Sequence, residues 1–259
     1  APESLVDEQI DGRTIVIGDI HGCANALESL LNEICPSTDD LVISLGDFVD
    51  TGRETSEVIQ QLISLEKTCR FIALMGNHEE MLLGALTSER LKQSWLMCGG
   101  VYTLNSYRFC GDIDVIPGEH LDFIRRCRDF YETPSHIFVH ANYVADVALE
   151  EQPDHVLRWS LLEEPYPEPH FSGKTVVVGH TEQRDGEILD LGHALCIDTY
   201  CHGYGWLTAV DDIGWDFAVH DGKATAARLT AWPNKPGILS DTAEAVCDVR
   251  HPDPITTRA

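Results

Sequence analysis

One pattern occurs three times in the first third of the chain and limits the folds that it can adopt. Short apolar, β-branched runs lie at residues 13–18, 40–46 and 70–76. Each run is followed by a segment whose apolar residues recur with the period of a helix, as at Leu27, Leu30 and Ile34. A β-α-β-α-β-α order predicts parallel strands joined by right-handed crossovers, and hence an α/β fold.

A glycine and a polar residue follow each of these predicted strands. The pairs are Gly18-Asp19, Gly46-Asp47 and Gly76-Asn77. Parallel strands bring their carboxyl ends to one edge of the sheet, which is where open α/β sheets bind ligands. We therefore expect these polar side chains to gather at one site.

The second half of the chain changes character, with short strand candidates and little helix between them. The candidates lie at residues 135–141, 174–180, 194–199, 204–211 and 215–222. Such a succession predicts a second, largely antiparallel sheet. We interpret residues 1–259 as a single domain with a core at about 14–220, a mostly helical cap at about 90–135 and an irregular tail at about 227–259.

Charge and cysteine usage limit the partners and the compartment. The 259 residues carry 43 acidic and 18 basic side chains, a formal net charge of −25, which repels nucleic-acid phosphates and disfavours nucleic-acid polymers as partners. No apolar run approaches the roughly 18 residues of a membrane span, so no membrane partner is expected. The polar amino terminus does not resemble a secretory signal. The nine cysteines form no CxxC pair, which favours a reducing cytoplasm.

A set of potential metal ligands follows the predicted strands of both halves. Its members are Asp19, His21, Asp47, Asn77, His78, His140 and His180. Each residue alone could be a turn, a helix cap or an ordinary histidine. Together, carboxylate, amide and imidazole groups suit Mn, Fe, Zn or Ni better than Ca.

Five separated motifs carry a resemblance to a known family. GDIHG at 18–22, GDFVDTG at 46–52 and GNHEE at 76–80 are followed by HA at 140–141 and GH at 179–180. In this order they resemble the calcineurin-like metallophosphoesterases, and most closely the bacterial serine/threonine phosphoprotein phosphatases. The resemblance implies two packed, mixed β-sheets flanked by helices in a four-layer sandwich, with a two-metal site between the sheets.

The resemblance also implies a role for each ligand. Asp19 and His21, with Asp47, would hold the first metal. Asp47 would bridge to the second, together with Asn77, His140 and His180. Two cations about 3.5–4 Å apart lower the pKa of a shared water and clamp phosphoryl oxygens during in-line displacement. Manganese is the expected metal in vitro, with Fe, Zn or Ni as alternatives.

His78 and Asp50 are the predicted catalytic pair. In the family, the histidine after the GN dipeptide protonates the leaving group, and the second aspartate of GDxVD orients it. A carboxylate beside an imidazole fixes its tautomer and raises its pKa. The alternative is that Asp50 merely caps a helix beginning near Arg53.

The chain departs from the family where a substrate phosphate is usually gripped. The family has an arginine directly after the second aspartate, and this chain has Thr51. Arg53 could fold back into the site or face solvent. The bacterial WxR pattern is also missing, because Trp159 is followed by Ser160 and Leu161, so Arg158 is the candidate substitute. No other side chain reproduces the bidentate grip of arginine on phosphate.

Two further residues are candidates for substrate contact. Tyr200 and His202 replace small residues in the block at 197–208, which in the family lies beside the active site. Packing in the core is the alternative for both.

Three functions remain open from the sequence. The leading prediction is a dinuclear-metal phosphatase acting on phosphomonoesters, including phosphorylated Ser, Thr or Tyr in proteins. A nucleotide-directed hydrolase, similar to the diadenosine tetraphosphatases or to phosphodiesterases, is the alternative, because both usual arginine anchors are missing or displaced. A metal-binding scaffold without catalysis is the third. The sequence does not fix the oligomeric state.

Overall fold

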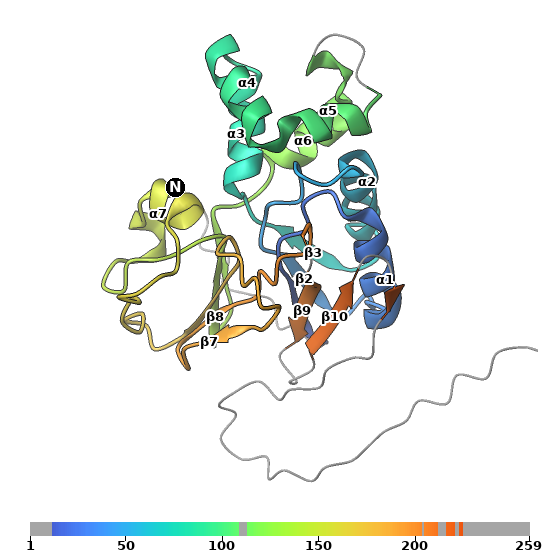
Figure 1. Ribbon diagram of the computed structural model, residues 1–259. Coiled ribbons are helices and arrows are strands. Elements are labelled where there is room, and N and C mark those ends of the chain that lie inside the picture. The colour runs from blue at the N-terminus through green and yellow to red at the C-terminus, as the bar shows by residue number, and fades with distance from the viewer. Residues whose placement is uncertain (1–11, 109–112, 204, 212–215, 221–222, 225–259) are drawn as a thin grey trace, which may run out of the picture.

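Two β-sheets pack face to face, with helices on their outer sides (Figure 1). The computed structural model describes residues 12–108, 113–203, 205–211, 216–220 and 223–224. The strands are β1 (Thr14–Ile17), β2 (Leu41–Ser44), β3 (Arg70–Ala73), β4 (Phe130–Glu132), β5 (His136–Val139), β6 (Thr175–Val178), β7 (Leu189–Asp190), β8 (Ala194–Cys196), β9 (Leu207–Asp211), β10 (Asp216–His220) and β11 (Lys223–Ala224). The helices are α1 (Ala24–Ile34), α2 (Thr55–Leu65), α3 (Asn77–Ala85), α4 (Glu89–Trp95), α5 (Val101–Ser106), α6 (Gly118–Arg125) and α7 (Asp154–Trp159), with short turns η1 (Leu96–Gly100), η2 (Ile113–Val115) and η3 (Leu149–Glu151).

The first sheet contains the three predicted β-α units. Its strand order is β11-β10-β9-β1-β2-β3, and β1, β2 and β3 are parallel, as the sequence predicts. Helices α1 and α2 cross between these strands and cover one face (Figure 1). Leu27 and Leu30 of α1 are fully buried there against Ile15 and Ile17 of β1.

The alternation of side chains along each strand separates the layers. Ile15 and Ile17 face the α1–α2 layer, whereas Val16 between them belongs to a core shared with the second sheet. Val177 of β6 packs in that inter-sheet core, and its neighbours Val176 and Val178 face a third cluster that includes residues of η3 and α7. The resulting order is helix, sheet, sheet, helix, which confirms the predicted four-layer α/β fold.

The second sheet differs from the antiparallel sheet expected from the strand spacing. Its order is β4-β5-β6-β8-β7, in which β5, β6 and β8 are parallel to one another and only β4 and β7 run antiparallel to their neighbours. The connections explain the difference, because η3 and α7 lie between β5 and β6, and β7 lies between β6 and β8. Both stretches are long enough for the crossover that parallel pairing requires.

The last two predicted strands also pair in the first sheet and not, as expected, in the second. β9 pairs antiparallel with β1 in the first sheet, with Val210 opposite Val16, and β10 pairs with β9. The sheet that begins the chain is therefore completed by strands from its second half.

Helices α3 to α6 form a layer above the strand ends of the first sheet, at the top of Figure 1. Helices α5 and α6, and nearly all of α4, lie in the region predicted as a helical cap, about 90–135, which also contains the strand β4. The predicted irregular tail lies outside the described residues. Among the described residues, no helix has the length and apolar character needed to cross a membrane.

Candidate metal centre

The carboxyl ends of strands from both sheets meet at one place. Asp19 and Asp47 follow β1 and β2 of the first sheet, and Asn77 opens α3 directly after β3. His140 and His180 follow β5 and β6 of the second sheet. All five lie at this shared edge, as the strand-end pattern predicts.

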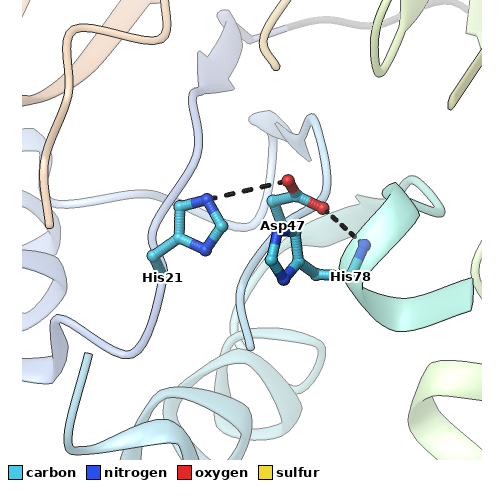
Figure 2. Close-up of side chains that lie close together, drawn as sticks. All are labelled: His21, Asp47 and His78. Carbon is cyan, nitrogen blue, oxygen red and sulfur yellow. Dashed lines mark hydrogen bonds and ion pairs between the residues drawn. The ribbon is translucent and has the colours of Figure 1, made fainter. Parts of the chain in front are cut away.

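Asp47 lies at the centre of the site, and Figure 2 shows it between His21 and His78. Its Oδ2 is 3.6 Å from Nε2 of His21 and 3.5 Å from Nε2 of His140. Its Oδ1 accepts a hydrogen bond of 3.0 Å from the backbone N–H of His78. A carboxylate in this position can serve two cations at once.

Potential ligand atoms form two groups that share Asp47. One group contains His21 and His78, the other His140 and His180, and within each group the atoms lie within 4.8 Å of one another. Asn77 belongs with the second group, since its Oδ1 is 3.0 Å from Nε2 of His140.

Backbone carbonyls orient the imidazoles. Nδ1 of His21 donates to the carbonyl of Val49 at 3.0 Å, and Nδ1 of His140 donates to that of Leu45 at 2.8 Å. A carbonyl can only accept, so Nε2 of each ring keeps its lone pair when the ring is neutral, and in both residues Nε2 lies toward Asp47. Burial is the largest influence on His21 and lowers its pKa to about 3, which keeps the ring neutral and able to bind a metal.

Asp19 supplies the clearest sign that a cation belongs here. It is 2% exposed, and its Oδ2 accepts the backbone N–H of His180 at 3.0 Å. Its Oδ1 is buried and has no hydrogen-bond partner among the described residues. Burial, together with the charges of Asp198 and Asp47, raises the pKa of this carboxyl well above its usual range. An uncompensated buried carboxylate costs several kcal/mol, and a bound cation would offset that cost.

The backbone approaches the carboxylates too closely for any residue but glycine at two positions. A Cβ on Gly76 would lie 2.1 Å from Oδ1 of Asp47, and one on Gly179 would lie 2.0 Å from Oδ1 of Asp19. His21, Asp47 and His180 themselves have positive φ angles of 46°, 48° and 63°. Strained backbone of this kind costs about 1–3 kcal/mol per residue and is concentrated at functional sites.

Glu79 supports the site, although the sequence analysis gave it no role. Its fully buried carboxylate accepts backbone N–H groups of Asp47 (2.8 Å), Phe48 (3.0 Å), Val49 (3.2 Å) and Gly76 (3.0 Å). It thereby joins the turn after β2 to the start of α3. Its place in the quoted GNHEE motif, three residues after Gly76, was the available signal.

His78 and Asp50 form a buried pair beside the ligands. Nδ1 of His78 lies 2.8 Å from Oδ2 of Asp50, which is fully buried. Trp95 and Thr103 also donate to this carboxylate, at 2.9–3.0 Å and 2.7 Å. Burial opposes protonation of His78, but the charges of Asp47 and Asp50 outweigh it and raise its pKa to about 9. A raised pKa of this kind favours the imidazolium form of the ring.

Neither of the two arginines predicted to bind substrate lines the cleft. Arg53 is exposed and does not line the cleft beside the ligand groups. Arg158 pairs with carboxylates of three residues and does not line the cleft either. Its partners are Asp129, Glu80 and Asp154.

Tyr200 and His202 lie beside the site. The His202 ring is 4.6 Å from that of His21 between centroids, and the Tyr200 ring is 4.8 Å from that of His202. The cleft has a volume of about 400 Å³. Its lining also includes four charged residues that the sequence analysis missed, Glu163, Glu182, Arg184 and Asp198. Asp198 lies in the block at 197–208, and Glu182 and Arg184 closely follow the GH motif at 179–180, so nearness to these motifs was the available signal.

Comparison with known proteins agrees with this geometry. The family model for calcineurin-like phosphoesterases matches residues 12–207. The chain belongs to the calcineurin-like phosphoesterase family. The match begins just before β1, ends at the start of β9, and includes every residue placed at the metal centre.

The curated relatives of this calcineurin-like phosphoesterase are named either as protein phosphatases or as bis(5'-nucleosyl)-tetraphosphatases. Serine/threonine-protein phosphatase 2 of Salmonella typhimurium is 40% identical over 34% of this chain, and phosphatase 1 of the same organism is 32% identical over 50%. A symmetrical bis(5'-nucleosyl)-tetraphosphatase of Erwinia tasmaniensis is 40% identical over 27%. The matches span 38%, 59% and 25% of these relatives' own lengths.

Solved structures support the same fold. A candidate diadenosine tetraphosphatase superposes with a TM-score of 0.62 at 22% identity, covering 82% of this chain and 95% of its own. A cold-active protein tyrosine phosphatase superposes with a TM-score of 0.60 at 17% identity, covering 82% and 78%.

Proposed function

We propose that this chain hydrolyses phosphomonoesters, including phosphorylated side chains of proteins, with two bound metal ions. The observation that carries the proposal is the arrangement around Asp47, which belongs to two groups of potential ligands and lies next to the hydrogen-bonded pair of His78 and Asp50. The names of the bacterial serine/threonine phosphatases support the substrate class.

The chain offers a complete set of ligands for two ions. Asp19, His21 and Asp47 would hold one ion. Asp47 would also hold the second ion, together with Asn77, His140 and His180. Such ions supply an activated water and neutralise charge on the phosphoryl oxygens. Manganese is the metal we propose for assays, because mixed N and O ligands accept several divalent ions of this series.

His78 would act on the leaving group. Its Nδ1–H donates to Asp50, so its Nε2–H is free to pass a proton to the departing oxygen. The hydrogen bonds from Trp95 and Thr103 keep the Asp50 carboxylate in place, and its charge keeps His78 protonated before the reaction. An intact pair of this kind speaks against a scaffold without catalysis.

A nucleotide-directed hydrolase is the second candidate. A symmetrical tetraphosphatase matches 27% of the chain, and neither predicted arginine anchor lines the cleft. Weaker cationic grip favours substrates with less charge per phosphate.

Assays of the metal-loaded protein on three substrates separate the candidates. The substrates are p-nitrophenyl phosphate, bis-p-nitrophenyl phosphate and diadenosine tetraphosphate. Turnover of the monoester alone supports the first proposal, and preferential cleavage of diadenosine tetraphosphate supports the second. Absence of turnover with every metal would favour the scaffold.

We further propose a cytoplasmic location, which the cysteine usage of the sequence supports. Fractionation of cells that express the tagged protein would test it.

A further inference from the structure

A row of aromatic rings begins at His78 and His21, which line the cleft, and continues through residues beside it. The His78 ring lies 4.8 Å from that of His21, and the His21 ring lies 4.6 Å from that of His202. The row continues to Tyr200 at 4.8 Å, each contact being edge-to-face. It ends under the guanidinium of Arg184, 5.2 Å above the Tyr200 ring.

Arg184 brings a permanent positive charge to this cleft. Of the described residues that line it, Arg184 alone is Lys or Arg. Its side chain is 72% exposed, so an incoming ligand can reach it. The face of Tyr200 attracts the guanidinium and limits its positions.

Glu182 holds Arg184 from one side. Nε and Nη2 of Arg184 both donate to Oε2 of Glu182, at 2.9 Å and 2.7 Å. Oε1 of the same carboxylate lies 3.4 Å from Nε2 of His202. Glu182 thus joins the arginine to the row of rings. Nη1 of Arg184 has no hydrogen-bond partner among the described residues, so it is available to donate to an anion.

The position of Arg184 relative to His78 indicates which part of a substrate Arg184 would contact. His78 would give its proton to the leaving group, so the leaving group would lie on the side of the cleft where His78 lies. Arg184 lines the same cleft at the other end of the row of rings, and it belongs to neither group of potential ligands. Its partner is therefore a second anionic group, carried by the leaving group.

We propose that Arg184, held by Glu182 over Tyr200, determines specificity by binding a carboxylate or phosphate on the leaving group. The cleft would then favour phosphoesters whose leaving group is anionic over those whose leaving group is neutral. This inference rests on the proposed function and specifies its substrate class. The anion could be an acidic side chain of a phosphopeptide or a further phosphate of a small molecule.

Steady-state kinetics of the metal-loaded protein test the inference. The substrates are p-nitrophenyl phosphate, a phosphoserine peptide with flanking Asp residues, the same peptide with Asn in their place, and diadenosine tetraphosphate. Arg184→Gln is compared with Arg184→Lys, and Arg125→Gln is the matched control, because Arg125 is an exposed arginine paired with Asp122 on α6. The acidic peptide and the tetraphosphate distinguish the two sources of the anion.

Loss of a charge-assisted contact predicts that Arg184→Gln lowers kcat/KM by roughly tenfold for at least one anionic substrate, through KM. Turnover of p-nitrophenyl phosphate and of the Asn peptide should stay within about twofold, and Arg184→Lys should restore part of the loss. Equal effects on all substrates, or none on the anionic ones, would overturn the inference and leave the proposed function standing. A wild-type protein inactive on every substrate would overturn both.

Discussion

Glu79 is the residue on which the shape of the metal centre depends most. Glu79→Gln keeps the size of the side chain but replaces one accepting oxygen with an NH₂ group. At least one of the four backbone N–H groups that Glu79 now binds then loses its acceptor. We expect the free energy of unfolding to fall by about 1–3 kcal/mol. Urea denaturation of the metal-free protein measures it. Glu80→Gln, next in sequence and partly exposed, is the control, and an equal effect of both would refute the role of Glu79.

His78 is expected to matter in proportion to the basicity of the leaving group. Removing a general acid lowers rates by about 10²–10⁴-fold where protonation is needed. His78→Asn should therefore slow an alkyl phosphate far more than p-nitrophenyl phosphate, whose leaving group needs little protonation. Side-by-side kcat measurements test this, and equal losses on both substrates would argue against the acid role.

At the scale of single residues, the sequence predicted at which edge of the sheet a side chain lies better than which other side chains it contacts. Glycine and polar residues after apolar runs placed Asp19, Asp47 and Asn77 at one edge, where the structure has them. Their roles as ligands remain predictions. Trp95 was not predicted, because it reaches Asp50 from a distant segment through a side-chain contact that no local spacing encodes. Arg184 was not predicted either, although it lies only four residues after His180.

At the scale of elements, the turn after β6 is as important as the ligands that flank it. Gly179→Ala would place a Cβ 2.0 Å from Oδ1 of Asp19 and displace that carboxylate. We expect loss of metal affinity and of activity. Gly118→Ala at the start of α6 meets nothing within 4 Å and is the control. Metal titration of both variants decides, and full affinity in Gly179→Ala would contradict the close packing described here.

Asp40 joins the start of β1 to the turn before β2. Its carboxylate accepts Arg13 Nη2 at 2.8 Å and the backbone N–H groups of Arg13 and Ser37, each at 2.8 Å. Burial opposes the charge, but these hydrogen bonds hold the pKa of Asp40 well below its usual range. A depressed folded-state pKa adds stability above the unfolded value of about 3.9, and this stability is lost as pH falls further.

Asp40→Asn should consequently lower the free energy of unfolding by roughly 1.5–3 kcal/mol at neutral pH. The difference from wild type should shrink as pH falls below about 4. Urea denaturation at a series of pH values measures it. A difference that does not change with pH would show that the charge of Asp40 adds nothing.

Local patterns predicted the elements themselves, because the periods of burial are local. They did not predict the partners of β9 and β10, or the parallel pairing of β5, β6 and β8. Pairing depends on the paths of connections such as that through α7, and strand spacing does not contain them.

For the whole molecule, the net charge of −25 opposes the approach of anionic substrates. Salt screens this repulsion, with a Debye length of about 10 Å at 0.1 M. We expect kcat/KM for p-nitrophenyl phosphate to rise as salt increases from about 20 to about 200 mM. A fall over this range would show that local positive charge at the cleft outweighs the field of the molecule.

The most direct test of the account is the metal content of the purified protein after it has been loaded with metal and desalted, measured by elemental mass spectrometry. We predict about two ions per chain for the wild type and for His78→Asn. Asp47→Asn should lose most of its metal together with its activity, because the charge shared by both ligand groups is gone. Only trace metal in the wild type, or an Asp47→Asn variant that keeps both ions and full turnover, would contradict the account.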